Sequence, residues 1–159
     1  MHFVTARLDT RDDFTELGRL YQALSEEMSA LSSLWSLADG LADPVDESLG
    51  EIVTNPDTVA FIGEIDGVPV GFLVARIEPM LPQAEGGKIG AIRLIFVDHE
   101  AREVGVGEAM LTAAVEALAS RGVSVFDAHV LPGHRLVKNF FEAGGFKARS
   151  IVMSRVHHG

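Results

Sequence analysis

Arg102, Gly105 and Gly107 form an Arg-x-x-Gly-x-Gly pattern where an apolar, strand-like run gives way to a helix-like run. Glycine has no Cβ, so the chain can turn sharply there, and a phosphate group can come close to the positive N-terminal end of the helix. A tight turn without a ligand explains the two glycines equally well. The spacing alone therefore leaves both an anion site and a simple turn open.

Two common phosphate-binding motifs do not match this stretch. A Walker A loop ends in Gly-Lys-Ser/Thr, but Glu108 and Ala109 follow Gly107 here. A dinucleotide fingerprint needs a third glycine, and Met110 stands at that position. The sequence therefore disfavours a nucleotide-binding domain built on either of these two phosphate-binding motifs.

Two histidines five residues apart supply candidate acid–base chemistry near neutral pH. His129, in a strand-like run, is the best candidate for a general base, although a histidine satisfied within the sheet explains it as well. Asp127 shares its strand face and can orient it or contact an amine. Asp98 and His99, just beyond another strand-like run, are weaker candidates.

Composition narrows the chemistry further. The chain has no cysteine, which excludes a disulfide framework, a thiolate metal site and a cysteine nucleophile. Its 13 Lys and Arg against 23 Asp and Glu give a net charge of −10 and no basic footprint, so no nucleic-acid partner is expected. The acidity can favour cationic amines or serve solubility alone. His157 and His158 are expected to lie in a C-terminal tail, and no metal site is expected.

The 159 residues form one expected domain, 1–159, with no internal repeat or linker. No apolar run is long enough to span a bilayer, and the N-terminal stretch lacks a basic region followed by an apolar core. We therefore expect no membrane association and, by default, a cytoplasmic protein.

Hydrophobic periodicity predicts the elements that must position these residues. Their order, β-α-α-β-β-β-α-β-α-β, predicts an α/β fold with a mixed sheet and helices on both faces. The strands are expected at 3–8, 58–65, 68–77, 88–97 and 123–130, with a final strand or pair of strands within 146–159. The helices are expected from Asp12 along an apolar stripe to Trp35, at 44–53, after Gly105, and at 135–143. Asp66-Gly67 is the expected hairpin turn.

The stretch 97–111, VDHEAREVGVGEAML, resembles the pyrophosphate-binding motif of the GCN5-related N-acetyltransferases. A second stretch, HVLPGHRLVKNFFEAGGF, is similar to the late part of that family, with His134 at the position of its usual Asn and Gly145-Phe146 at its closing Gly-Phe. The hairpin EIDGVPVGFLVARI resembles the central hairpin of the family, and the element order agrees over the whole chain.

The resemblance implies an acyl-CoA N-acyltransferase fold, with a mostly antiparallel sheet splayed at the CoA site. It implies acetyl-CoA as co-substrate and transfer of acetyl to a primary amine, on a small molecule or a peptide, by direct attack. The implied cofactor contacts are the main chain of Ile95, Phe96 and Val97 for pantetheine, the N–H groups of Glu103, Val104, Gly105, Val106, Gly107 and Glu108 for pyrophosphate, and Arg102, His134 and Phe141.

The resemblance also implies an oxyanion donor on the strand, the N–H of Val97 or Ile95. Many members carry a tyrosine that protonates the thiolate, but Phe141 stands there and cannot donate a proton. Tyr21 lies on an apolar helical stripe and is expected in the core. A catalytically silent CoA-binding module, regulatory or structural, is therefore the alternative.

In this family the acceptor site commonly lies near the region that holds Glu26, Glu27, Trp35 and Asp39. Acidic groups there would suit a cationic amine, although a solvated helix face explains the two glutamates as well. A homodimer through the late strands or the exposed helices stays open.

Overall fold

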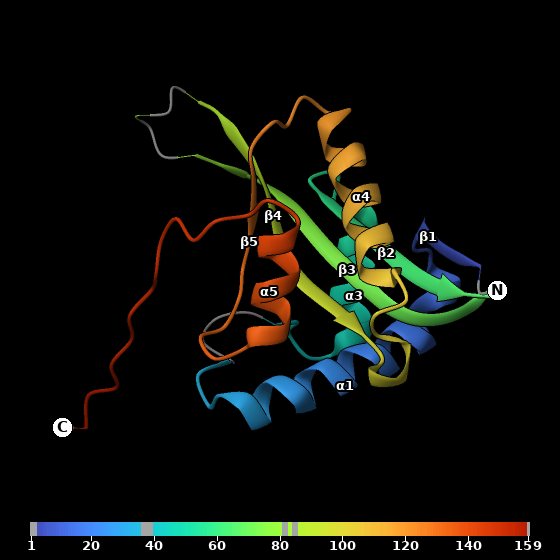
Figure 1. Ribbon diagram of the computed structural model, residues 1–159, viewed down its shortest axis with the longest axis horizontal. Helices are drawn as coiled ribbons and strands as arrows, with labels where there is room; N and C mark the ends of the chain where they lie inside the picture. Colours follow the sequence, from blue (N-terminus) through green and yellow to red (C-terminus); the bar gives the residue numbers. More distant parts are fainter. Residues whose placement is uncertain (1–2, 36–39, 81–82, 84–85, 159) are drawn as a thin grey trace.

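The computed structural model describes residues 3–35, 40–80, 83 and 86–158. Its centre is a five-stranded sheet in the order β1-β2-β3-β4-β5 (Figure 1). The strands are β1 Val4–Leu8, β2 Thr58–Ile65, β3 Val68–Pro79, β4 Lys88–Val97 and β5 Phe126–Ala128. The first four pair antiparallel and β5 pairs parallel to β4, which confirms the expected mixed, mostly antiparallel sheet.

Within the described residues, four α-helices cover the two faces of the sheet. They are α1 Phe14–Leu31, α3 Val45–Thr54, α4 Val106–Ala119 and α5 Arg135–Ala143, with short 3-10 turns η1 Arg11–Asp13 and η3 His99–Ala101. Helices α1 and α3 pack on one side, called here the α1 face, and α4 and α5 pack on the other, the α4 face. The element order agrees with the sequence expectation from β1 to α5.

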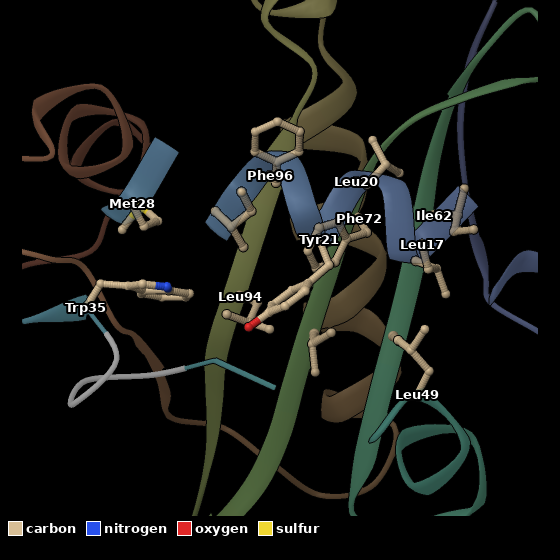
Figure 2. Packing of buried hydrophobic residues seen from close by; sticks show 13 residues of the cluster. Leu17, Leu20, Tyr21, Met28, Trp35, Leu49, Ile62, Phe72, Leu94 and Phe96 are labelled. Carbon is tan, nitrogen blue, oxygen red and sulfur yellow. The ribbon is translucent and has the colours of Figure 1, made fainter. Parts of the chain in front are cut away.

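Each face has its own core, because successive side chains of a strand point to opposite sides. On the α1 face, Tyr21 and Met28 of α1 pack with Trp35, Leu94 and Phe96 (Figure 2). The α4 face buries a separate set that includes Leu73, Ile92, Met110, Leu118 and Phe141. The chain therefore needs both helical layers to bury its sheet.

The hairpin between β2 and β3 turns at Asp66 and Gly67, as predicted. Both residues have positive φ, 51° and 80°, the combination that matches the twist of antiparallel strands in a two-residue turn. The turn sets the register of β3, and β3 in turn aligns β4.

The β4–β5 pair is short, and this produces the splay that the site needs. Only Gly90 to Ile92 of β4 pair with β5, and beyond Ile92 the two strands part. At that point Arg93 is an extra residue in β4, since Val74 pairs with Leu94 and Ala75 with Ile92. Such a bulge increases the local twist of the strand, which favours separation of its neighbours.

Three expectations about the elements were wrong. The first helix ends at Leu31 and does not continue to Trp35; Ser32 is extended, and Trp35 reaches the same core after this break. The strand expected at 123–130 is confined to Phe126–Ala128, because β4 turns away after Ile92; the carbonyl of Val125 and the N–H of His129 make the last hydrogen bonds at the two ends of this pairing. No strand forms within 147–158, where every residue is exposed.

None of the described helices is long and apolar enough to cross a membrane.

Candidate functional site: a cavity where β4 and β5 part

A cavity of about 260 Å³ lies where β4 separates from β5, between the end of β4, the start of α4 and the start of α5. It is lined by Glu27, Ile95, Phe96, Val97, Ala101, Arg102, Glu103, Gly105, Val106, Gly107, Glu108, His134, Leu136, Val137 and Phe140. The structure thus brings together ten of the twelve residues implied as cofactor contacts. Val104 and Phe141 are not among its lining residues.

The main chain of β4 presents open hydrogen-bonding groups to this cavity. The N–H of Asp98 donates to the carbonyl of Val70 on β3 at 2.7 Å. Because successive residues direct their main-chain groups to opposite sides, Phe96 also faces β3, whereas Ile95 and Val97 direct theirs away from it. That is the side from which β5 has diverged, so an extended molecule can pair there.

The loop before α4 supplies a second set of main-chain donors. Gly105 adopts the left-handed conformation, φ 93°, and α4 starts at the next residue. The first main-chain N–H groups of a helix have no acceptor within it, and no side chain caps this end. The N–H groups of Val106, Gly107 and Glu108 are therefore suited to an anion.

Gly107 has a packing reason of its own. A Cβ at this position would lie 3.1 Å from the ring of Phe140 on α5. The absent side chain therefore lets the first turn of α4 approach α5, which closes one wall of the cavity. Packing against Phe140 therefore explains the second glycine of the Arg-x-x-Gly-x-Gly pattern without any ligand.

Arg102 ties the loop to two other elements. Its Nε donates to the carbonyl of Val97 at 2.9 Å, and its Nη2 lies 2.9 Å from Oε1 of Glu27 on α1. The guanidinium also stands over the ring of Phe96, 5.6 Å from its centre. Since the side chain of Arg102 is only 19% exposed, this ion pair is less screened by water than a surface pair.

His134 lies half-buried at the N-terminal end of α5 and lines the cavity. Burial lowers the pKa of its imidazole below the usual 6.5; the charge of Glu27 opposes that shift and the charge of Arg102 adds to it. At neutral pH this histidine is therefore uncharged, and it can accept or donate one hydrogen bond.

Phe140, and not Phe141, faces the cavity from α5. Phe141 is 3% exposed and packs edge-on against both Phe140 and Phe146, each ring centre 5.2 Å away. Ala101, Leu136, Val137 and Phe140 line the cavity and were missed from the sequence. The spacing of Val137 and Phe140, one helical turn apart, was the available signal.

His129 lies outside this cavity lining, on an exposed stretch just after β5. Its Nδ1 is 3.1 Å from Nη1 of Arg93, which also forms an ion pair with Glu78. A guanidinium can only donate, so Nδ1 is the acceptor and the ring proton sits on Nε2. Strand alternation places His129 with Asp127 on the α1 face, and Asp127 accepts from Nε of Arg149 at 2.7 Å.

The residues expected near the acceptor fall into different environments. Glu27 lines the cavity, whereas Glu26 is exposed and accepts from Gln22 of the same helix at 3.2 Å. Trp35 and Tyr21 are buried in the α1-face core, which confirms the core role expected for Tyr21. The hydroxyl of Tyr21 accepts from the N–H of Leu41 at 2.8 Å.

The remaining candidates do not join the cavity. Asp98 lies 3.4 Å from Nη1 of Arg19, and His99 starts the turn η3. Asp39 lies outside the described residues. No group of three or more His, Cys, Asp or Glu side chains within the described ranges is arranged to hold a metal ion.

The fold is thus a mixed sheet in which β4 separates from β5 near the end of β4. The N-termini of α4 and α5 lie beside this opening. A model of the Acetyltransferase (GNAT) family matches residues 17–146. The chain belongs to this family, as the sequence motifs implied.

Individual relatives are distant. An uncharacterized N-acetyltransferase of Methanocaldococcus jannaschii is 28% identical over 92 residues, which are 58% of this chain and 40% of the relative. The chain therefore matches less than half of the length of this curated relative.

Solved structures share the fold over the whole chain. An aminoglycoside N-acetyltransferase, AAC(6′)-Iy, solved in complex with CoA, aligns with a TM-score of 0.76 and 19% identity, over 100% of this chain and 97% of its own. A ribosomal-protein-alanine N-acetyltransferase from Brucella melitensis biovar Abortus 2308 aligns with a TM-score of 0.69 and 18% identity, over 99% of each chain.

Proposed function

We propose that this protein binds acetyl-CoA in the cavity between β4, α4 and α5 and transfers the acetyl group to an amine. The observation that carries the proposal is that two sets of main-chain groups available for hydrogen bonding face the same cavity. The main-chain groups of Ile95 and the N–H of Val97 face the cavity at the strand edge, while the carbonyl of Val97 accepts from Arg102; the first turn of α4 presents uncapped N–H groups. Family membership supports the same assignment.

The residues present fit this co-substrate, which supplies an acyl group already activated as a thioester. The strand edge of Ile95 and Val97 would pair with the amides of the pantetheine arm, as an added strand does. The N–H groups from Glu103 to Glu108 would hold the pyrophosphate. Leu136, Val137 and Phe140 offer an apolar wall to the arm.

The charged side chains on the cavity wall are mostly acidic, so main-chain N–H groups would have to recognise the phosphates. Three glutamates, Glu27, Glu103 and Glu108, line the cavity beside one arginine. That arginine, Arg102, already pairs with Glu27. Arg102 would therefore act on the phosphates mainly by fixing the loop whose N–H groups hold them.

The transfer requires four changes: the amine nitrogen bonds to the acyl carbon, the carbon–sulfur bond breaks, the amine loses a proton and the sulfur gains one. The N–H of Val97 would stabilise negative charge on the acyl oxygen; its direction away from β3, towards the cavity, supports this role. Positioning by these groups can supply much of the rate.

His129 is our proposed general base. Proton uptake at Nδ1 requires Arg93 to release that nitrogen and stay with Glu78, its partner in the ion pair. Replacing His129 by Gln should lower kcat at least about tenfold and remove a pH dependence near the pKa of the imidazole. His158→Gln, at the end of the chain, is the matched control. An unchanged pH profile in His129→Gln would take this residue out of the mechanism.

The function itself is tested by titration calorimetry with acetyl-CoA, with ATP and NAD as comparators, followed by CoA release in a panel of amines. We expect micromolar binding of acetyl-CoA, little or no binding of ATP and NAD, and CoA release with one class of amine. Absence of acetyl-CoA binding would overturn the whole proposal and leave the glycines as packing and turn residues.

The alternative is a CoA-binding module without turnover, which one observation favours. Phe141 occupies the position where many relatives place a proton-donating tyrosine, and it is buried among Phe140 and Phe146. In the transferase, water or the acceptor would then protonate the sulfur. Tight acetyl-CoA binding with no CoA release across the amine panel would select the silent module.

We also propose that the acceptor is a positively charged amine, that the protein forms a homodimer and that it is located in the cytoplasm. A small or peptide amine with positive charge suits a chain of net charge −10 and the carboxylate of Glu27 on the cavity wall.

A further inference from the structure

A groove of about 410 Å³ lies between β1 and α4 and is called here the β1 groove. Residues 4–6 line it from β1, and the flank of α4 between Glu108 and Glu116 lines it from the other side. β1 is the outermost strand of the sheet on this side (Figure 1). The β1 groove shares only Gly105 and Glu108 with the cavity beside β4, so it is a separate surface.

The main chain on the outer side of β1 is open to another strand. The strand pairs with β2 in regular register, and the N–H of Asp9 donates to the carbonyl of Ala60 on β2 at 3.2 Å. By alternation, the N–H and C=O groups of Val4 and Ala6 point away from β2. No described strand lies on that side, so these groups can pair with an added strand.

This edge lacks the features that usually protect an outer strand. Natural edge strands avoid pairing through proline, an exposed lysine or a bulge. The sequence of β1, VTARL, has neither proline nor lysine, and its pairing with β2 shows no register shift. Its charged residue, Arg7, contacts Asp13 at 2.7 Å and Glu64 at 3.0 Å. The guanidinium is thus engaged within the protein and does not guard the edge.

The α4 side of the β1 groove carries three polar side chains, Glu108, Thr112 and Glu116. They are four residues apart, so they share one flank of the helix and follow one another about 6 Å apart along its axis. All three are exposed. Neither carboxylate forms an ion pair with a Lys, Arg or His of the described residues. Two uncompensated negative charges therefore border the open strand edge.

The spacing of these three side chains matches that of an added strand. Alternate side chains of a strand point to the same face and lie about 6.6–6.8 Å apart. A strand paired with β1 would thus set three successive side chains of one face beside Glu108, Thr112 and Glu116. Basic side chains at the first and third positions would meet the two carboxylates, and a polar side chain at the second would meet the hydroxyl of Thr112.

We propose that the β1 groove binds an extended segment of a partner protein, with the pattern basic-x-polar-x-basic, which adds a strand to β1. Main-chain hydrogen bonds to Val4 and Ala6 supply affinity, and Glu108 and Glu116 select the basic residues. The net charge of −10 attracts such a segment as it approaches. This inference is independent of acetyl transfer, because the added strand uses no group of β4.

The test uses a fluorescently labelled peptide, Val-Lys-Val-Thr-Val-Lys-Val, and measures its anisotropy with the full-length protein, without acetyl-CoA. We expect binding that weakens at least tenfold when both lysines of the peptide are replaced by glutamine. Glu116→Lys in the protein should weaken it at least tenfold as well, because it places a like charge opposite the peptide. Glu51→Lys, at an exposed residue of α3 on the α1 face, is the matched control and should bind the peptide as the original protein does.

Two N-methylated peptides test the strand addition itself. One is methylated at the main-chain nitrogen of its threonine and the other at that of the next valine. Neighbouring residues direct their N–H groups to opposite sides, so only one of the two methyl groups blocks a bond to β1. We expect the affinities of these two peptides to differ at least tenfold.

Three results would overturn the proposal: no binding of the unmodified peptide, equal binding of the two methylated peptides, or equal binding by Glu116→Lys and the original protein. A fourth comes from sedimentation of the protein alone. If Glu116→Lys dissociates a dimer that the original protein forms, the β1 groove holds a second copy of this chain and not a basic partner segment.

Discussion

Arg102 shows how one side chain can organise the proposed site without touching a ligand. Its Nε and Nη2 reach the main chain of Val97 and the carboxylate of Glu27, so a loop, a strand end and α1 are fixed together. The planar guanidinium has several donors in a rigid arrangement, whereas the ammonium of a lysine is a single point. Charge alone is therefore insufficient at this position.

We predict that Arg102→Lys lowers the affinity for acetyl-CoA about tenfold, because the lysine can keep the partner at Val97 or at Glu27 but not both. Calorimetry gives the dissociation constant. Arg19→Lys, at an exposed arginine of α1, is the control and should bind as the original protein does. Equal affinities for Arg102→Lys and the original protein would show that the loop needs only the positive charge.

At the scale of elements, the turn from β4 into α4 depends on backbone geometry at Gly105. Its φ is 93°, and a Cβ there would meet nothing within 4 Å. The cost of a side chain at this position is thus conformational strain alone, in contrast to Gly107, where the ring of Phe140 is in the way.

We predict that Gly105→Ala lowers the free energy of unfolding by about 1–2 kcal/mol, the usual cost of the left-handed conformation, and that Gly105→Asn costs less. Gly18→Ala, inside α1 with open space around it, should stabilise by up to about 1 kcal/mol. Urea unfolding measures all three. If Ala and Asn at position 105 cost the same, strain is not what the glycine avoids.

The sequence predicted best those elements whose signals are local. The central strand and the last helix agree with Lys88–Val97 and Arg135–Ala143 to the residue, because an apolar run and a pair of terminating glycines mark their ends. The first helix was predicted too long because the buried Trp35 continues its apolar periodicity. Periodicity shows which residues are buried but not whether the helix between them is unbroken. The length of β5 depends on where β4 turns away, which no local pattern shows.

The site was predictable in its main-chain part and less so in its side chains. The Arg102 loop followed from motif spacing, but the contact with Glu27 joins residues 75 positions apart. Likewise, the contact between Arg93 and His129 depends on a bulge in β4 that sequence periodicity does not reveal.

At the scale of the whole molecule, one carboxyl group works against folding. Oδ2 of Asp9 is buried without a hydrogen-bond partner among the described residues. Burial, and secondly the charge of Asp13, raise the pKa of Asp9 from 3.8 to about 6. The folded state therefore binds this proton more tightly than the unfolded chain, so folding loses stability as the pH rises from about 4 to about 6 and regains none above that.

We predict that Asp9→Asn raises the free energy of unfolding by about 1 kcal/mol above pH 6, a value reduced for the partial exposure of this group. The gain should fade as the pH drops towards 4. Thermal unfolding across this pH range measures it, with Asp57→Asn, an exposed aspartate, as control. A gain that is constant at every pH would assign the effect to something other than ionisation.

The open edge of β4 has a consequence for how this protein can change over evolutionary time. Backbone amides are the same in every residue except proline, so the hydrogen bonds of this edge do not depend on which side chain stands at Ile95 and Val97. Both side chains pack against the α4-face core, so one apolar residue can replace another there while the edge keeps its hydrogen-bonding groups. Descendants could then drift towards new acceptors through the α1 face while the same strip of main chain continues to serve the donor.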